Sequence, residues 1–137
     1  MVNLTLIRGL PGSGKSTRAK VLAGKTDAVH LEGDQYYELE EDGEYFFNHK
    51  WLKDAHKRCQ RLTQACLDIG RDVVVSNTFT QLWEMDVYLA MAANNLMIDV
   101  SVLTMTRMYG SIHNVPQEAI DRMEARWEDF EGEVLLT

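Results

Sequence analysis

The chain has 137 residues, of which 45% are hydrophobic and 26% are charged, a balance typical of one folded domain rather than of a disordered chain. Fourteen basic against twenty-one acidic residues give a net charge of −7, which argues against a protein that coats nucleic acid through bulk electrostatics. No apolar run approaches the ~18 residues of a membrane span, and the first residues lack the pattern of a secretory signal. We therefore expect a cytoplasmic protein with no membrane association.

Short apolar segments alternate with longer amphipathic segments along the whole chain. Strands are expected over residues 4–7, 28–31, 72–76 and 98–103, with residues 134–136 as a fifth strand or an irregular end. Helices are expected over residues 15–23, 48–69, 81–94 and 116–130, and Gly24 and Gly70 are expected to end the first two. This alternation predicts a single α/β domain over residues 1–137, with three layers and a parallel sheet of four or five strands between helices.

The helix expected over residues 48–69 carries two stripes of side chains. Its apolar stripe steps by three and four residues through Leu52, Ala55, Cys59, Leu62, Cys66 and Ile69. On one helix the two cysteines would be separated by roughly 10 Å of axial rise, whereas a disulfide needs Cα atoms within ~7 Å, so we predict reduced thiols. The second stripe is Lys50, Lys53, Lys57 and Arg61. Near Trp51 it is a candidate site for a phosphate backbone and a stacked base, although a solvated helix face is the commoner origin of such a stripe.

Two further predictions concern aromatic residues and their apolar surroundings. Trp83, at the start of the helix expected over residues 81–94, is expected to pack against the sheet. Trp127, Phe130 and the tail are candidates for an exposed apolar patch, which leaves the oligomeric state open.

A glycine-rich segment between the first strand and the first helix matches G-x-x-x-x-G-K-S/T without a mismatch. It comprises Gly9, Leu10, Pro11, Gly12, Ser13, Gly14, Lys15, Ser16 and Thr17. Glycines let the backbone wrap a phosphate with N–H groups pointing inward, and the helix that follows adds the positive end of its dipole. Lys15 would reach the β- and γ-phosphates, and the Ser16 hydroxyl would bind Mg²⁺. The segment predicts nucleoside-triphosphate binding but does not separate kinases from ATPases and GTPases.

The residues that follow the second and third strands narrow this choice. The sequence has no Asn-Lys-x-Asp guanine motif, and its triple-valine strand is followed by Ser76 and Asn77, so a Walker B carboxylate is missing from its expected place. Asp34 instead follows the second strand, and the carboxyl ends of parallel strands meet at one edge of a sheet. Asp34 is therefore a candidate base near the γ-phosphate, with a helix cap or a carboxylate behind Mg²⁺ as the alternative.

Several motifs together resemble the kinase domain of bacteriophage polynucleotide 5′-hydroxyl kinases. They are the phosphate loop, Gly33-Asp34-Gln35-Tyr36, Ser76-Asn77-Thr78 and Val115-Pro116. The tripeptide Trp83-Glu84-Met85 is similar to a Trp-Glu-Met motif found in related AAA-type P-loop ATP-binding proteins. The resemblance implies that Asp34 is the general base for a 5′-hydroxyl, that Lys15 and Ser16 bind the triphosphate and Mg²⁺, and that the substrate side includes Tyr37, Asn77 and Thr78. Sugar-nucleotide kinases share much of this plan, so the acceptor does not follow from the fold.

The chain departs from that family at two places. Tyr37 stands where the family has an arginine after the base, and Gly110-Ser111 stands where the family lid has Arg-Asn. The expected lid, over residues 104–115, is short. Arg107 is the remaining candidate for an arginine that closes over the γ-phosphate, and Arg122 is a weaker one because a helix-surface ion pair explains it as well.

These observations predict an ATP- and Mg²⁺-dependent kinase that transfers the γ-phosphate to a hydroxyl. The leading acceptor is the 5′-hydroxyl of a polynucleotide or nucleoside, and the expected catalytic residues are Lys15, Asp34 and Arg107. The reduced lid favours one alternative, a nucleotide-binding regulatory or partner-binding module with little or no phosphotransfer. A small-molecule kinase is the other.

Overall fold

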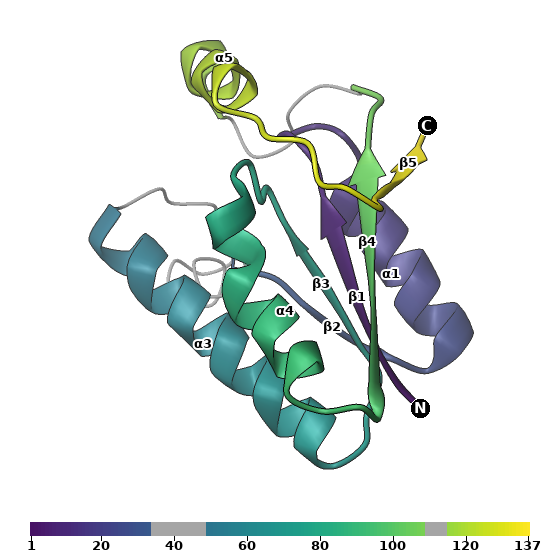
Figure 1. Cartoon of the computed structure of the whole chain (residues 1–137). Helices are drawn as coiled ribbons and strands as arrows, with labels where there is room; N and C mark the ends of the chain where they lie inside the picture. Colours follow the sequence, from purple (N-terminus) through teal and green to yellow (C-terminus); the bar gives the residue numbers. More distant parts are fainter. Residues whose placement is uncertain (34–48, 109–114) are drawn as a thin grey trace.

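The computed structural model describes residues 1–33, 49–108 and 115–137, with side chains described from residue 53 in the second range. Figure 1 shows the elements in chain order: β1 (Val2–Arg8), α1 (Lys15–Thr26), β2 (Val29–Leu31), α3 (His49–Asp68), β3 (Val73–Asn77), the 3-10 helix η1 (Leu82–Met85), α4 (Asp86–Ala93), β4 (Ile98–Met105), α5 (Gln117–Ala125) and β5 (Val134–Leu136). Each predicted strand is present, and the tail forms the fifth.

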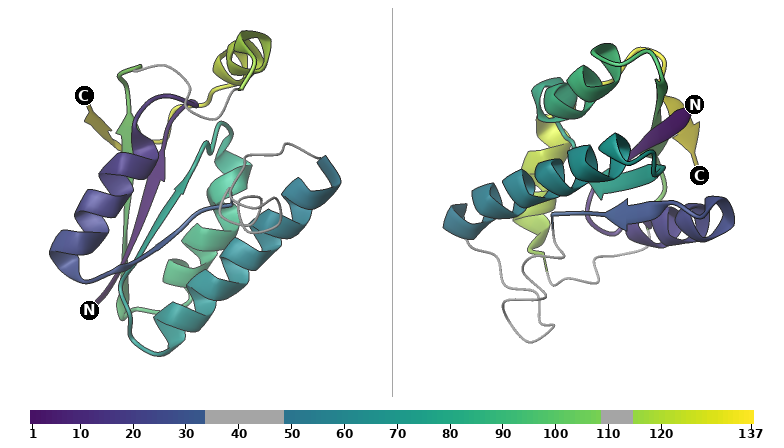
Figure 2. Two further views of the ribbon diagram at one scale, coloured as in Figure 1. Left: turned by 180° about the vertical axis from the view of Figure 1, so that it is seen from behind. Right: turned by 90° about the horizontal axis from the view of Figure 1, so that it is seen from below.

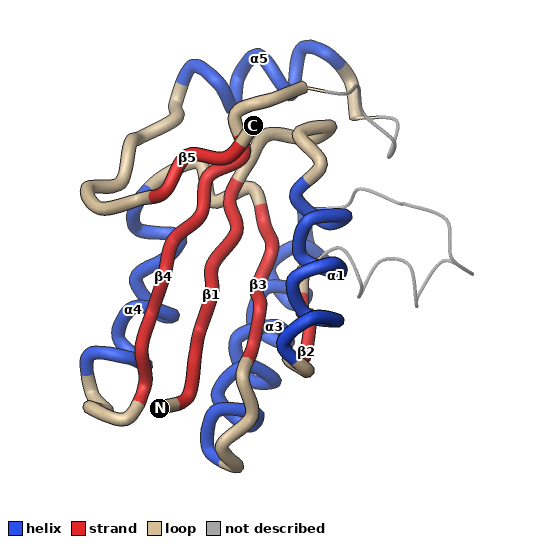
Figure 3. The backbone as a smooth tube through the Cα atoms, turned by 90° about the vertical axis from the view of Figure 1, so that its right-hand side faces the viewer, coloured by secondary structure: helices blue, strands red, loops and turns tan. Residues whose placement is uncertain are grey.

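The five strands form one parallel sheet in the order β2-β3-β1-β4-β5 (Figure 3). β1 is the central strand, and its last residue, Arg8, lies opposite Asn77 at the end of β3. Because all the strands run in the same direction, their carboxyl ends meet at a single edge of the sheet. Open parallel sheets bind their ligands at that edge.

Helices cover both faces of this sheet, as the view from below shows most clearly (Figure 2, right). Successive strand residues point to opposite faces. Leu4 and Leu6 belong to the buried cluster that includes residues of α3 and α4, whereas Ile7 packs with Ala19 and Ala23 of α1. The predicted α/β fold with helices on both faces is therefore confirmed. α5 lies beyond the carboxyl edge of the strands (Figure 1).

The long helix α3 buries a stripe that steps by four residues through Ala55, Cys59, Thr63 and Leu67. The predicted apolar stripe is correct at Ala55 and Cys59 but wrong at its end, since Ile69 is 77% exposed beyond the last turn. Both cysteines are free thiols, as predicted. Burial raises the pKa of the Cys59 thiol, an effect that the side chains of Tyr88, Asn77 and Thr63 partly oppose.

The basic stripe of α3 behaves as the solvated-face interpretation expects. Lys53, Lys57 and Arg61 are all exposed, and the side chains of Lys50 and Trp51 lie outside the described part of the chain. The acidic residues between positions 38 and 44 also lie outside it.

The first helix does not end where its glycine predicted. α1 runs through Gly24 to Thr26, and Asp27, with a φ of +56°, provides the left-handed turn that ends it. The N–H of Ala28 closes this end on the carbonyl of Ala23 at 3.0 Å. A short polar side chain takes the left-handed position here, so the signal was at Asp27 rather than at the glycine.

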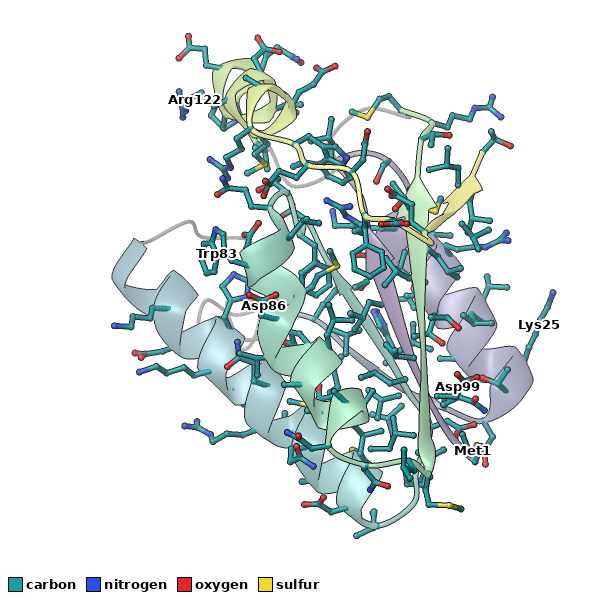
Figure 4. All side chains as sticks on the ribbon, in the orientation of Figure 1. Met1, Lys25, Trp83, Asp86, Asp99 and Arg122 are labelled. Atoms are coloured by element: carbon teal, nitrogen blue, oxygen red, sulfur yellow. The ribbon has the colours of Figure 1, made fainter. Side chains whose placement is uncertain are left out.

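The segment predicted as one helix over residues 81–94 divides into η1 and α4. Glu84 causes the tight first turn, because its Oε2 accepts from the N–H of Gln81 at 2.7 Å and from the Thr80 hydroxyl at 2.8 Å. Met85 and Tyr88 take the buried face. The prediction that Trp83 packs against the sheet is wrong: it is 65% exposed and projects outward from η1 (Figure 4).

The C-terminal third departs from the prediction in two ways. Thr104 and Met105 belong to β4, so the segment expected to form a lid begins later than residue 104, and residues 109–114 lie outside the described chain. α5 ends at Ala125, and the residues after it run back toward the sheet. Trp127 and Phe130 are half-buried there, so the predicted exposed patch is wrong for these two residues, whereas Val134 and Leu135 of the tail are exposed.

Within the described residues, no helix is both long enough and apolar enough to cross a lipid bilayer.

Replacement of Gly24 by alanine should stabilise the protein by about 0.5–1 kcal/mol, because an interior helical glycine costs conformational entropy and a Cβ at this position meets nothing within 4 Å. The free energy of unfolding from urea titration provides the measurement. Gly70→Ala is the matched control: its site is equally open, but its φ of +80° strains an alanine, so it should destabilise. Equal effects of the two substitutions would contradict the helical assignment of Gly24.

Candidate active site

The turn between β1 and α1 has the shape of an anion cradle. Gly12 and Gly14 adopt φ angles of +87° and +84°, which only glycine adopts without strain. Gly14 is the N-cap of α1 and provides no side-chain cap, so the first N–H groups of the helix are not satisfied by a capping side chain. Such groups, together with the helix dipole, bind phosphate.

The cradle is closely packed behind the position of the phosphate. A Cβ on Gly9 would lie 2.3 Å from Ser13 Oγ and 3.1 Å from Met105 Cβ, so a side chain is excluded there. Ser13 is 1% exposed, and its hydroxyl has no hydrogen-bond partner in the structure. Lys15, the first residue of α1, is buried as well, so the end of the loop and the start of the helix are packed together.

Ser16 extends this cradle toward the end of β2. Its hydroxyl donates to Glu32 Oε2 at 2.8 Å, and the Ser76 hydroxyl donates to the same oxygen at 2.8 Å. A serine hydroxyl backed by a carboxylate is an oxygen donor set of the kind that Mg²⁺ prefers. The residues present therefore fit the magnesium ion that the sequence predicts at Ser16.

His30 completes this group of polar side chains. Its Nε2 lies 2.7 Å from Ser76 Oγ and 3.6 Å from Glu32 Oε2. Since the single Ser76 proton points to Glu32, His30 Nε2 must carry the proton that it donates to Ser76. Burial lowers the pKa of His30, Glu32 opposes that shift and Lys20 adds to it.

Asn77 lies on the other face of β3 and connects this strand to the end of β2. Its Oδ1 accepts from the N–H of Gly33 at 2.8 Å, and its Nδ2 is buried without a hydrogen-bond partner. Gly33 is tightly surrounded, since a Cβ would lie 3.2 Å from the His56 ring and would require that ring to shift by a few tenths of an ångström. The residue that precedes Asp34 is therefore fixed at the carboxyl edge of the sheet.

The predicted site residues are brought together only in part. The phosphate loop, Asn77 and Thr78 meet at the carboxyl edge, where the Gly9 N–H donates to the Thr78 carbonyl at 3.3 Å. Asp34 and Tyr37 lie outside the described residues, so their roles stay predictions. Arg107 is exposed just after β4, and its approach to the γ-phosphate also stays a prediction.

Arg122 is exposed on α5 and points away from the sheet (Figure 4).

Arg8 is the largest feature that sequence reasoning missed. It directly precedes the phosphate loop and is fully buried. Its guanidinium donates to the carbonyls of Phe79, at 3.0 and 2.6 Å, and Glu128, at 2.7 Å, and lies 4.1 Å from the Trp127 ring centroid. Burial lowers its pKa, and four carboxylates oppose that shift, foremost Glu133 at 3.6 Å. An arginine remains charged under these conditions.

Glu133 joins this buried charge to β4 and to its own turn. It accepts a hydrogen bond from the Thr104 hydroxyl and another, at 2.5 Å, from the N–H of Phe130. One arginine thus links the end of the central strand to the chain that returns from α5. A charged residue at the end of an otherwise uncharged strand was the available sequence signal for Arg8.

The fold and this edge of the sheet define a P-loop protein. The chain matches the AAA domain family AAA_33 over residues 4–130, and it belongs to that family. A human relative, NEDD4-binding protein 2, is 38% identical over 91 residues, which are 65% of this chain but only 5% of that protein.

Solved structures with this fold include several kinases. A sugar kinase from Janibacter sp. HTCC2649 has a TM-score of 0.68 at 18% identity, covering 99% of this chain and 84% of that one. The Mycobacterium tuberculosis APS kinase CysC in complex with AMPPNP and APS has a TM-score of 0.66 at 18% identity, covering 99% and 88%. A chain of the Pnkp1/Rnl/Hen1 RNA repair complex has a TM-score of 0.62 at 20% identity, covering 96% and 40%.

Replacement of Arg8 by methionine should lower the free energy of unfolding by about 3–5 kcal/mol, because it leaves Glu133 and several carbonyls buried without their partner. Arg8→Lys should recover only part of the loss, since an ammonium lacks the planar fork that reaches both carbonyls. Urea unfolding measures both variants.

Arg71→Met is the control for this experiment. Arg71 is exposed and makes one bond of 3.3 Å to the Asp27 carbonyl, so its loss should cost less than about 0.5 kcal/mol. An Arg8→Met protein as stable as the control would show that the buried guanidinium does not hold the C-terminal segment.

Proposed function

We propose that this protein is an ATP-dependent kinase that transfers the γ-phosphate to a hydroxyl, with the 5′-hydroxyl of a polynucleotide or nucleoside as the leading acceptor. One observation carries the proposal: the phosphate loop and Gly33 meet at one edge of the sheet, with the Gly33 N–H held 2.8 Å from Asn77 Oδ1. Asp34 is covalently next to Gly33, which supports a base on the acceptor side of the triphosphate.

The transfer requires one bond to form and one to break. The acceptor oxygen attacks the γ-phosphorus, the bond between that phosphorus and the β–γ bridging oxygen breaks, and ADP leaves. Asp34 takes the proton of the attacking hydroxyl. Lys15 and the N–H groups of the loop stabilise the charge on the phosphate oxygens, so positioning and electrostatics supply most of the rate.

Ser16 would hold Mg²⁺, which neutralises charge on the β- and γ-phosphates when it is bound. Arg107 is the proposed arginine that approaches the γ-phosphate from the segment after β4. Asn77 is the proposed acceptor contact on β3, at the edge where its Oδ1 accepts from the Gly33 N–H.

An exposed indole at this edge supports a nucleic-acid acceptor. Trp83 follows the carboxyl end of β3, and its Nε1 is held by Gln81 Oε1 at 3.1 Å. Exposed aromatic rings of fixed orientation stack nucleobases, and nearby cations attract the phosphate backbone. α3 exposes such cations at Lys53, Lys57 and Arg61.

Incubation with γ-labelled ATP and Mg²⁺ tests the reaction against three acceptors: a 5′-hydroxyl oligonucleotide, a nucleoside and a sugar. We expect label on the oligonucleotide. Asp34→Asn should lower the rate by about 10²–10⁴-fold, the usual contribution of a general base, and Lys15→Ala should abolish transfer. Lys25→Ala, at an exposed lysine in the last turn of α1, is the control that should leave the rate unchanged.

The other outcomes of this assay would either favour an alternative function or contradict the phosphate site. Tight ATP binding with no transfer to any acceptor would favour a nucleotide-binding regulatory or partner-binding module. Label on the sugar alone would favour a small-molecule kinase. ATP affinity that is unchanged in Lys15→Ala would contradict the phosphate site itself.

Replacement of Trp83 by alanine should raise the KM for an oligonucleotide by about 5- to 100-fold, which corresponds to the ~1–3 kcal/mol of a base–aromatic stack. The KM for ATP should stay the same, and Trp83→Phe should retain most of the affinity. Leu96→Ala is the control, since Leu96 is 92% exposed but precedes β4 at the opposite edge of the sheet. Equal KM values for Trp83→Ala and the control would exclude stacking at Trp83.

A further inference from the structure

The carboxylate that usually stands behind the magnesium ion of a P-loop site is missing from its usual strand. P-loop enzymes hold Mg²⁺ with the loop Ser or Thr and an acidic residue at the end of the neighbouring strand. Here that strand is β3, and Ser76 lies beside Ile7 of β1 at its end. A serine hydroxyl carries no charge, so it cannot perform the electrostatic part of that role.

Glu32 brings a carboxylate to the same place from one strand further out. Its side chain is only 8% exposed, and its Oε2 lies 2.8 Å from both Ser16 Oγ and Ser76 Oγ. The carboxylate therefore contacts the loop hydroxyl directly, as an acid on β3 would.

Strand geometry explains why a glutamate and a serine occur together. β2 is separated from β1 by β3, and neighbouring strands lie ~4.8 Å apart, so an acid that follows β2 must reach one strand spacing further. The additional methylene of glutamate lengthens its reach. The small Ser76 side chain leaves the path open, and its hydroxyl, which accepts from His30, donates to the arriving oxygen.

We propose that Glu32 positions Ser16 and the water ligands of Mg²⁺, and so replaces the missing acid of β3. Because the Ser16 hydroxyl donates its proton to Glu32, the lone pairs of its oxygen would be available to Mg²⁺. The inference rests on the proposed Mg²⁺–ATP site and adds the residue that tunes it. Glu32 acts through Ser16 and water, so it is a positioning residue rather than a catalytic one.

The test measures the affinity of the full chain for a fluorescent ATP analogue across a Mg²⁺ titration and, separately, in EDTA. Glu32→Gln keeps the shape and removes the charge. We expect it to raise the Mg²⁺ concentration required for half-maximal tightening by about 10- to 100-fold, the usual effect of losing a partner behind a metal ligand. Its affinity in EDTA should stay within about twofold of the wild type, since a purely structural role would weaken both conditions equally.

Relocation of the acid gives a second, independent readout. Glu32→Ser combined with Ser76→Asp moves the carboxylate to β3 and should restore the Mg²⁺ dependence that Glu32→Gln loses. Glu32→Asp, one methylene shorter, should lose it in part, and Ser76→Ala, which keeps Glu32, should lose less than Glu32→Gln. Thermal unfolding without ligand verifies that each variant folds.

The outcomes separate this inference from the proposed function. Wild-type binding that tightens with Mg²⁺, together with an unchanged Mg²⁺ dependence in Glu32→Gln, would overturn the role of Glu32 alone. Equal losses with and without Mg²⁺ would assign Glu32 a structural role and overturn the inference as well. A wild-type protein that shows no Mg²⁺-dependent nucleotide binding would overturn both the role of Glu32 and the kinase proposal.

Discussion

A buried positive charge organises the half of the molecule that carries the site. Arg8 has no exposed surface, and its desolvation is offset only because backbone carbonyls, an indole face and Glu133 surround it. Those groups come from the loop after β3 and from the chain that returns from α5. Both segments therefore take their positions from the last residue of β1, and the phosphate loop starts from the same point.

The last two residues of β3 point to opposite faces of the sheet and contact different parts of the site. Ser76 points to the face of α1 and joins Ser16, His30 and Glu32. Asn77 points to the face of α3 and fixes Gly33. The alternation of one strand thus places the polar group at Ser16 on one face of the sheet and the Asn77–Gly33 hydrogen bond on the other. The two groups of side chains meet at the carboxyl edge of the sheet.

The sequence predicted the features that depend on local rules. Alternating apolar segments defined the parallel sheet, and the match from Gly9 to Thr17 located the phosphate loop. The sequence-based prediction failed where contacts between distant segments determine whether a side chain is buried and what it binds. The burial of Arg8 depends on carbonyls more than seventy residues away, the partner of Ser16 was hidden because Glu32 carries no motif, and Trp83 is exposed because Met85 and Tyr88 fill the core. Helix ends were displaced for a simpler reason, since an aspartate at Asp27 replaced the expected glycine.

The segment between Thr106 and Leu136, which contains α5, has its two ends at neighbouring positions. Thr106, just past β4, donates both its N–H and its hydroxyl to the Leu136 carbonyl at 2.8 Å, at the end of β5. Because these two ends are already joined by hydrogen bonds, a longer segment between them costs only ~0.6 kcal/mol of loop-closure entropy for each doubling of its length. Length can therefore be added to this segment at little entropic cost, provided that Trp127, Glu128 and Glu133 keep their contacts with Arg8.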